Sequence, residues 1–111
     1  MDDPGSFTPV IVVLPDEVDI TNAESMREQL RTEFGAGVAV VIADMTSTAF
    51  CDVACFRNLL VAHDEAGANG TQLRLVIGPG PVFRLLMMLG LDHRLAVYPS
   101  LRLARSGNSA H

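Results

Sequence analysis

The sequence predicts a single α/β domain, in which helices pack on a small, mostly parallel β-sheet. Apolar, β-branched runs typical of buried strands alternate along the chain with amphipathic stretches typical of helices. The connections are short, and right-handed crossovers between parallel strands place the helices against the sheet. A length of 111 residues suffices for one core. We expect the domain at residues 9–105, after a flexible arm at residues 1–8 and before a polar tail at residues 106–111.

The first half of the chain is expected to supply two strands and the helix between them. The first strand is predicted at residues 10–14. Thr21 and Glu24 have the spacing of a capping box, which predicts a helix from there to about Phe34. The next strand, at residues 38–43, is apolar throughout. It is therefore expected at the centre of the sheet, buried on both faces.

The second half of the chain continues the alternation. Asp52 is a favourable N-cap, and apolar residues follow it at helical spacing, which predicts a second helix to about residue 66. Pro81 and Gly90 have the positions that begin and end a third helix. The remaining elements are a strand at residues 72–77, the third helix at 81–89, a strand at 95–98 and a helical turn or two at 99–105.

Composition and charge exclude several classes of function. The net charge of -5 leaves no concentrated basic face for a phosphate backbone, so nucleic acid is not an expected partner. No apolar run approaches the roughly 20 residues that span a bilayer, so we expect no direct membrane insertion. The acidic first residues lack the pattern of a secretory signal, and two cysteines do not make a disulfide framework. Both features favour the cytoplasm.

Several short motifs occur in a particular order and spacing: Asp19 and Asn22 in VDITNA, Asp44 at a strand end, Phe50 and Asp52 before the second helix, the strand LRLVI and the stretch VFRLLMMLGLDHRLAVYPS. Together they resemble the STAS domain family, which includes bacterial anti-sigma factor antagonists and the cytoplasmic tails of sulfate transporters. The resemblance extends from about residue 10 to about residue 104 and implies a STAS-like fold.

The functional motif of the family is Asp-Ser-Ser/Thr-Gly-Leu at the start of the second helix. There, an anti-sigma factor with kinase activity phosphorylates a hydroxyl just after the Asp, and the phosphate blocks binding. The corresponding segment of this chain reads Asp52, Val53, Ala54, Cys55 and Phe56. Neither Val53 nor Ala54 has a hydroxyl, so the resemblance implies the binding surface without the usual switch. A displaced phosphoacceptor at Ser47 or Thr48 is left open.

The resemblance implies that the partner is an anti-sigma factor of the protein-kinase type; a homodimer is left open. The expected partner-binding residues are Asp19, Thr21, Asn22, Cys51, Asp52, Val53, Ala54, Cys55, Phe56 and Arg57. A second candidate contact face on the third helix consists of residues outside its buried stripe: Phe83, Met87 and Met88. The alternative is that this helix is buried on several sides by neighbouring elements. Two other functions also stay open: an accessory subunit of a signalling scaffold or lipid-transport complex, and a sensor of a small ligand or nucleotide.

Cys51 and Cys55 allow two interpretations. Cys55 falls in the first turn of the predicted helix, where the helix dipole and free amides favour a thiolate. A reversible disulfide with Cys51 would then replace phosphorylation as the regulatory input. The interpretation that we prefer from the sequence is that both are small, inert core residues, since free cysteines are commonly buried.

Catalysis is not expected, and neither is a cofactor or a metal ion. Asp19, Asp44 and Asp52 come at or after strand ends, as the carboxylates of a magnesium site would, but capping and turn formation explain all three. No His and Cys spacing suits zinc, and His63 on the apolar stripe of the second helix is a packed histidine. No nucleophile, base and orienting group can be assembled.

Overall fold

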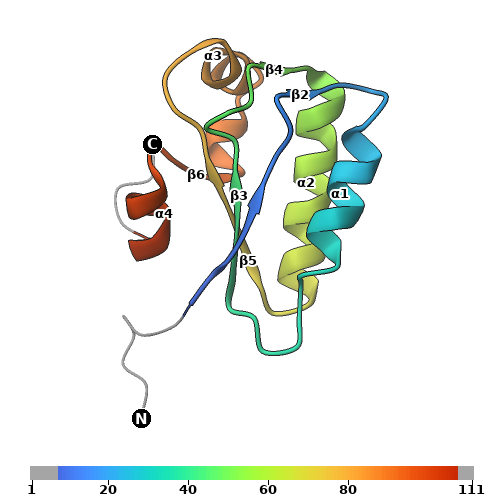
Figure 1. Cartoon of the computed structure of the whole chain (residues 1–111), viewed down its shortest axis with the longest axis vertical. Helices are drawn as coiled ribbons and strands as arrows, with labels where there is room; N and C mark the ends of the chain where they lie inside the picture. The colour runs from blue at the N-terminus through green and yellow to red at the C-terminus, as the bar shows by residue number, and fades with distance from the viewer. Residues whose placement is uncertain (1–7, 108–111) are drawn as a thin grey trace.

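A four-stranded parallel sheet forms the centre of the computed structural model, which describes residues 8–107 (Figure 1). Its strand order is β1–β3–β5–β6, and every neighbouring pair is parallel. The predicted fold class is confirmed. Most of the expected arm, and the end of the expected tail, lie outside the described residues. The strands are β1 (Val10–Val13), β3 (Val40–Asp44), β5 (Gln72–Val76) and β6 (Ala96–Tyr98).

Strand β3 lies in the middle of this sheet, as its apolar sequence predicted. It pairs with β1 on one side and β5 on the other, and its first four residues are buried. Because successive side chains point to opposite faces, Val41 and Ala43 join one hydrophobic cluster while Val40 and Ile42 join another. The sheet therefore has an apolar core on both faces. The strand begins two residues later than expected.

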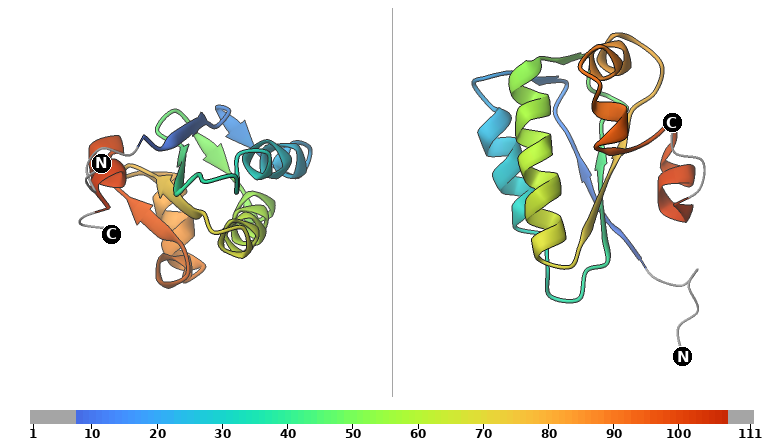
Figure 2. Two further views of the ribbon diagram at one scale, coloured as in Figure 1. Left: turned by 90° about the horizontal axis from the view of Figure 1, so that it is seen from below. Right: turned by 180° about the vertical axis from the view of Figure 1, so that it is seen from behind.

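Helices cover the two faces of the sheet unequally (Figures 1 and 2). Helices α1 (Ala23–Arg31) and α2 (Val53–Ala68) lie side by side on one face, and the shorter α4 (Leu101–Ser106) lies on the other. Helix α3 (Pro81–Met88) and a short 3₁₀ helix, η1 (Leu91–His93), lie toward the end of the sheet where β3 and β5 finish. The helices of the larger layer pack mainly through Met26, Leu30, Phe56 and Leu59.

The sequence did not predict a second, two-stranded sheet. It consists of β2 (Glu17–Val18) and β4 (Phe50–Cys51), which pair in parallel. Each strand has only two residues, too few for an alternating pattern to be visible in the sequence. The pair lies beyond the ends of β1 and β3, on the side of α1 and α2 (Figure 1).

The two ends of α1 differ from the prediction. Asn22, not Thr21, is the N-cap, and its side chain makes no capping hydrogen bond. The predicted capping box is therefore wrong, because Thr21 donates to Asp19 instead of bonding the helix. The helix ends at Arg31, and Phe34 lies beyond it, half-buried against the core. At the other end of the chain, α4 extends to Ser106, one residue into the stretch expected to be tail.

Candidate functional site

The β2–β4 pair brings together the two segments that the sequence singled out. Val18 pairs with Cys51, and the backbone N–H of Asp52 donates to the carbonyl of Val18 at 3.3 Å. Because the strands are parallel, the segments that follow them leave at the same edge. One is the turn at residues 19–22, and the other is the start of α2. We call the surface formed by residues 19–22 and 50–57 the edge surface.

Side-chain hydrogen bonds fix the turn at residues 19–22. Asp19 Oδ1 accepts from the backbone N–H of Thr21 at 2.8 Å and from its hydroxyl at 2.5 Å. Asn22 Oδ1 accepts from the N–H of Asp19 at 2.9 Å, and its amide group donates to the carbonyl of Glu17 at 2.9 Å. The hydroxyl and N–H of Thr21 lower the pKa of the Asp19 carboxyl below its usual value. This carboxylate therefore stays charged at neutral pH.

The start of α2 carries the segment that the sequence singled out, residues 52–56. Asp52 is the N-cap, as predicted, and its Oδ1 accepts from the N–H of Cys55 at 3.1 Å. Val53 is 46% exposed, Arg57 is exposed and Ala54 is half-buried. Both positions that lack a hydroxyl therefore lie at or near the surface. Phe56 is buried in the core, so it supports the edge surface from beneath.

Cys51 and Cys55 form a disulfide bond. Their Cα atoms are 5.8 Å apart, within the usual range for a disulfide. The preferred interpretation from the sequence, two inert free cysteines, is therefore wrong, although both residues are buried as it assumed. The bond joins the last residue of β4 to the first turn of α2 and encloses Asp52, Val53 and Ala54.

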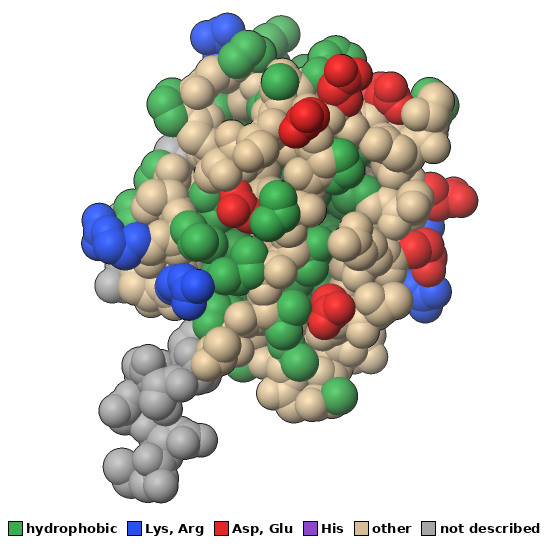
Figure 3. Space-filling model, viewed as in Figure 1, with side chains coloured by type: hydrophobic (Ala, Val, Ile, Leu, Met, Phe, Trp, Pro, Cys, Tyr) green, Lys and Arg blue, Asp and Glu red, His purple; other side chains and the backbone are tan. Residues whose placement is uncertain are grey.

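Two apolar residues of the edge surface were not among the predicted site residues. Ile20, at the tip of the turn, is 79% exposed, and Phe50 on β4 is 50% exposed. Ile20 could have been found from the sequence, because it is a large apolar residue between the polar residues of a predicted turn. In Figure 3, acidic side chains lie among hydrophobic ones along the end of the molecule that contains β2 and β4. The edge surface is thus apolar with flanking carboxylates.

The second candidate face, on α3, is partly exposed. Met88 is 82% exposed, and Met87 and Leu89 are also exposed. Phe83 instead packs, half-buried, against the core. A groove of about 190 Å³ connects this face to the start of α2, and its walls are Val53, Phe56, Arg57, Leu60, Leu89 and Leu91.

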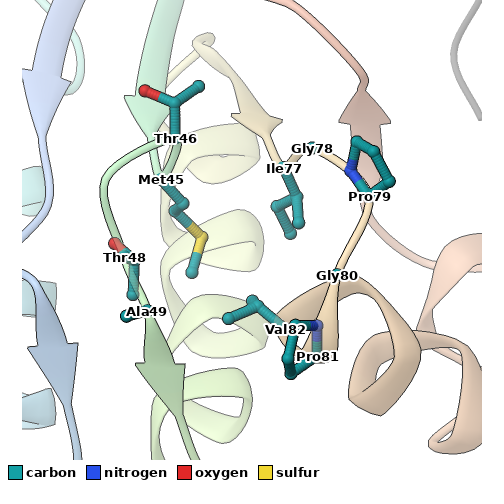
Figure 4. Close-up of a pocket in the computed structure, with 10 residues that line it drawn as sticks. All are labelled: Met45, Thr46, Thr48, Ala49, Ile77, Gly78, Pro79, Gly80, Pro81 and Val82. Atoms are coloured by element: carbon teal, nitrogen blue, oxygen red, sulfur yellow. The ribbon is translucent and has the colours of Figure 1, made fainter.

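A separate hollow of about 320 Å³ lies between the β3–β4 loop and the loop that leads into α3 (Figure 4). None of the described residues that line it is charged; its walls are Met45, Thr46, Thr48, Ala49, Ile77, Gly78, Pro79, Gly80, Pro81 and Val82. The hydroxyl of Thr48 donates to the carbonyl of Pro15 at 2.8 Å, and Thr48 is buried. Ser47, in contrast, is exposed.

The three carboxylates considered for a metal site have separate partners. Asp44 Oδ1 accepts from the N–H of Thr46 at 2.9 Å. The carboxylate of Asp19 accepts from Thr21 in the turn, and the carboxylate of Asp52 accepts from the N–H of Cys55 as the cap of α2. Within residues 8–107, no three His, Cys, Asp or Glu side chains are grouped to hold a metal ion.

The same residues contain no helix both long and apolar enough to cross a bilayer. His63 is half-buried on α2, and its Nδ1 has no hydrogen-bond partner among the residues that the structure describes.

Sheet, helices and edge surface together define an open-sheet α/β domain that presents loops and a helix start at one edge. The chain belongs to the STAS domain family, because the sequence pattern of that family matches residues 3–104. No curated protein matches the chain in sequence.

Solved structures with the same fold have diverse functions. A crystal structure of an anti-sigma factor antagonist from Mycobacterium paratuberculosis has a TM-score of 0.80 and 18% identity, covering 96% of this chain and 88% of that one. The unphosphorylated anti-sigma factor antagonist SpoIIAA has a TM-score of 0.63 and 20% identity, covering 91% of each chain. The murine anion transporter Solute Carrier 26 family member A9 has a TM-score of 0.72 and 22% identity, covering 90% of this chain and 18% of the transporter. At these identities the likeness shows the fold alone.

The geometry of the turn predicts how Asp19 titrates. Replacing Thr21 with Val removes the hydroxyl, which is the largest cause of the lowered pKa, so the pKa of Asp19 should rise toward its usual value. Thr21→Ser keeps the hydroxyl and should not change it. Because the folded-state pKa is lowered, the turn stabilises the fold above the usual pKa and loses this contribution as the pH falls through the folded-state value. NMR titration of the carboxyl carbon measures the midpoint; equal midpoints in the wild type and Thr21→Val would contradict the assignment.

The helix cap predicts a difference between two substitutions of Asp52. Asp52→Ala leaves the N–H of Cys55 without its side-chain acceptor and should lower the free energy of unfolding by about 1 kcal/mol. Asp52→Asn retains an oxygen acceptor and should lower it much less. Urea unfolding followed by circular dichroism checks both, and equal losses in the two variants would show that capping is not the role of Asp52.

Proposed function

We propose that the chain is an anti-sigma factor antagonist. It binds an anti-sigma factor of the protein-kinase type in the cytoplasm and so regulates transcription that depends on a sigma factor. It acts by binding and not by catalysis. The observation that carries this proposal is the edge surface: the turn after β2 and the start of α2 form one exposed surface. By the resemblance in sequence, the α2 part of that surface corresponds to the segment in which antagonists of the family carry a phosphorylated hydroxyl. The structural likeness to two anti-sigma factor antagonists supports it.

The chemistry of the edge surface defines what its partner should offer. Ile20, Phe50 and Val53 expose apolar area, which is stabilised when water is excluded from it. Asp19 and Asp52 are half-buried carboxylates beside them. A complementary partner surface would place an apolar patch against the three apolar side chains and Lys or Arg beside the carboxylates.

The absence of a hydroxyl at residues 53 and 54 removes the usual way to switch such a surface off. A phosphate carries a charge of about −1.5 to −2, and burying it beside Asp52 in an interface would be costly. Val53 and Ala54 do not accept a phosphoryl group, so the edge surface stays in its unmodified form. Thr48 does not replace them, because its hydroxyl is buried and bonded to Pro15.

A second candidate function is an accessory STAS subunit of a larger assembly. The exposed Met87, Met88 and Leu89 favour it, because Met side chains adapt to irregular partner surfaces. The neighbouring groove is lined by Leu89 together with Val53, Phe56 and Arg57 of the edge surface, whereas Met87 and Met88 lie outside it. A partner held by the two Met side chains therefore does not depend on Val53. Capture of a structural or transport protein that Met88→Ser abolishes and Val53→Asp does not would identify this function.

The binding proposal predicts the effect of a charge at the centre of the edge surface. Val53→Asp places a carboxylate in the first turn of α2, where the helix dipole tolerates it, so the fold should be retained. Affinity for the cognate anti-sigma factor should fall about tenfold or more, because the interface must bury an unpaired charge. Calorimetric titration against each kinase-type anti-sigma factor of the source genome measures the affinity. Val61→Asp is the matched control, since Val61 is exposed on the same helix outside the edge surface. Equal affinities for wild type and Val53→Asp would refute the proposal.

The missing switch predicts a gain of function. In the presence of ATP and the cognate anti-sigma factor, the wild type should acquire no phosphate on residues 51–56. Val53→Ser or Ala54→Ser restores a hydroxyl in the first turn of α2, and one of the two should become phosphorylated and lose affinity. Mass spectrometry locates the phosphate. Phosphate at Ser47 of the wild type would show that the acceptor has moved and not disappeared.

A further inference from the structure

The disulfide bond lies directly beneath the middle of the edge surface. Cys51 is the last residue of β4, and Cys55 lies in the first turn of α2. The three residues between them, Asp52, Val53 and Ala54, are the N-cap and the two positions that lack the family's hydroxyls. A change in this bond therefore acts on the same residues that phosphorylation would reach in other members of the family.

We propose that the Cys51–Cys55 disulfide is a reversible redox switch. When it is formed, it holds the end of β4 against the first turn of α2 and keeps the edge surface in one conformation. When it is reduced, this connection is lost and the surface loosens. The consequence for partner binding rests on the proposed function, whereas the redox chemistry of the two cysteines does not.

A reductant reaches the buried sulfur atoms because the small β2–β4 sheet opens easily. The β2–β4 pair has two residues on each strand and lies apart from the main sheet. The backbone hydrogen bonds from Phe50 to Asp16 and from Asp52 to Val18 are both 3.3 Å long, and a shorter bond between these segments, from Ala49 to Asp16 at 2.7 Å, lies before β4 begins. A two-stranded ribbon is marginally stable by itself, so it opens at a lower free energy than the core strands. Its opening exposes Cys51 without unfolding the domain.

The reduction step is a thiol–disulfide exchange with a dithiol reductant. A thiolate of the reductant attacks Sγ of Cys51 and forms a mixed disulfide, while the bond to Cys55 breaks and Sγ of Cys55 leaves as a thiolate. The N-terminus of α2 stabilises this leaving thiolate before it takes up a proton. The second thiolate of the reductant then displaces Sγ of Cys51, which is protonated in turn. Two electrons pass to the protein, and the reductant becomes a disulfide. A small-molecule disulfide reverses the reaction.

The reduced form differs at the edge surface because the core there is tightly packed. Two thiols need separate space where one disulfide stood, and Cys55 and Phe56 are fully buried among neighbouring side chains. Asp52 still caps α2, but its position relative to β4 is no longer fixed by a covalent bond. Binding must then order this segment, and that ordering lowers affinity.

The redox chemistry is tested on the full chain without any partner. The chain is equilibrated with defined ratios of reduced and oxidised dithiothreitol, and free thiols are counted by alkylation and mass spectrometry. We expect a reversible change of two thiols with unchanged circular dichroism. Amide exchange of residues 52–57 should be roughly tenfold faster in the reduced form, with β3 and β5 unaffected. Unfolding on reduction, or identical exchange in the two forms, would overturn the proposal.

The regulatory consequence is tested with the anti-sigma factor that binds the oxidised chain. Reduction should weaken its affinity about fivefold or more, and reoxidation should restore it. The Cys51→Ala/Cys55→Ala variant should bind weakly and be insensitive to redox state; Cys51→Ala alone serves the same purpose if the double variant is unstable. Equal affinity of the reduced and oxidised wild type would overturn the switch. If no anti-sigma factor binds the oxidised chain, the proposed function fails, while the thiol titration still decides the redox chemistry.

Discussion

The parallel pairing of β2 with β4 is the constraint on which the candidate site depends. It consists of two residues on each strand, yet it determines where the turn at residues 19–22 and the start of α2 lie. Without it, the two segments would be connected only through the main sheet and the helices. The bond from Asp52 to Val18 extends the pairing by one residue and brings the N-cap of α2 into the same arrangement. A weak local structure thus positions the exposed surface, while the strong parallel sheet positions the core.

The start of α2 combines three features within five residues. Asp52 caps the helix, the disulfide ties its first turn to β4, and the residues between carry no hydroxyl. Val53 and Ala54 therefore offer no phosphoryl acceptor, and the cap and the disulfide fix the backbone on either side of them. The covalent bond supplies a constraint that the marginal two-stranded ribbon does not provide by itself.

Local patterns in the sequence were sufficient for the main sheet, the helices and the Asp52 cap. The apolar run of β3 and the cap of α2 are properties of neighbouring residues, so they are visible in the sequence. The β2–β4 pair was not predicted because two-residue strands show no period and their partners are distant in the chain. The predicted capping box does not form because the Thr21 hydroxyl bonds the carboxylate of Asp19 and not the backbone of the helix. Whether Cys51 and Cys55 meet depends on how β4 enters α2, and the spacing of the two residues does not determine that.

The most direct test of the account is to map the contact surface on the chain by NMR while a kinase-type anti-sigma factor is added. Because the edge surface is formed by two segments distant in sequence, both should respond together. We predict that amide shifts change at residues 19–22 and 50–57, with α4 unaffected. Changes confined to α4, or to the end of α3 around Met88, would contradict the central claim that the edge surface binds the partner.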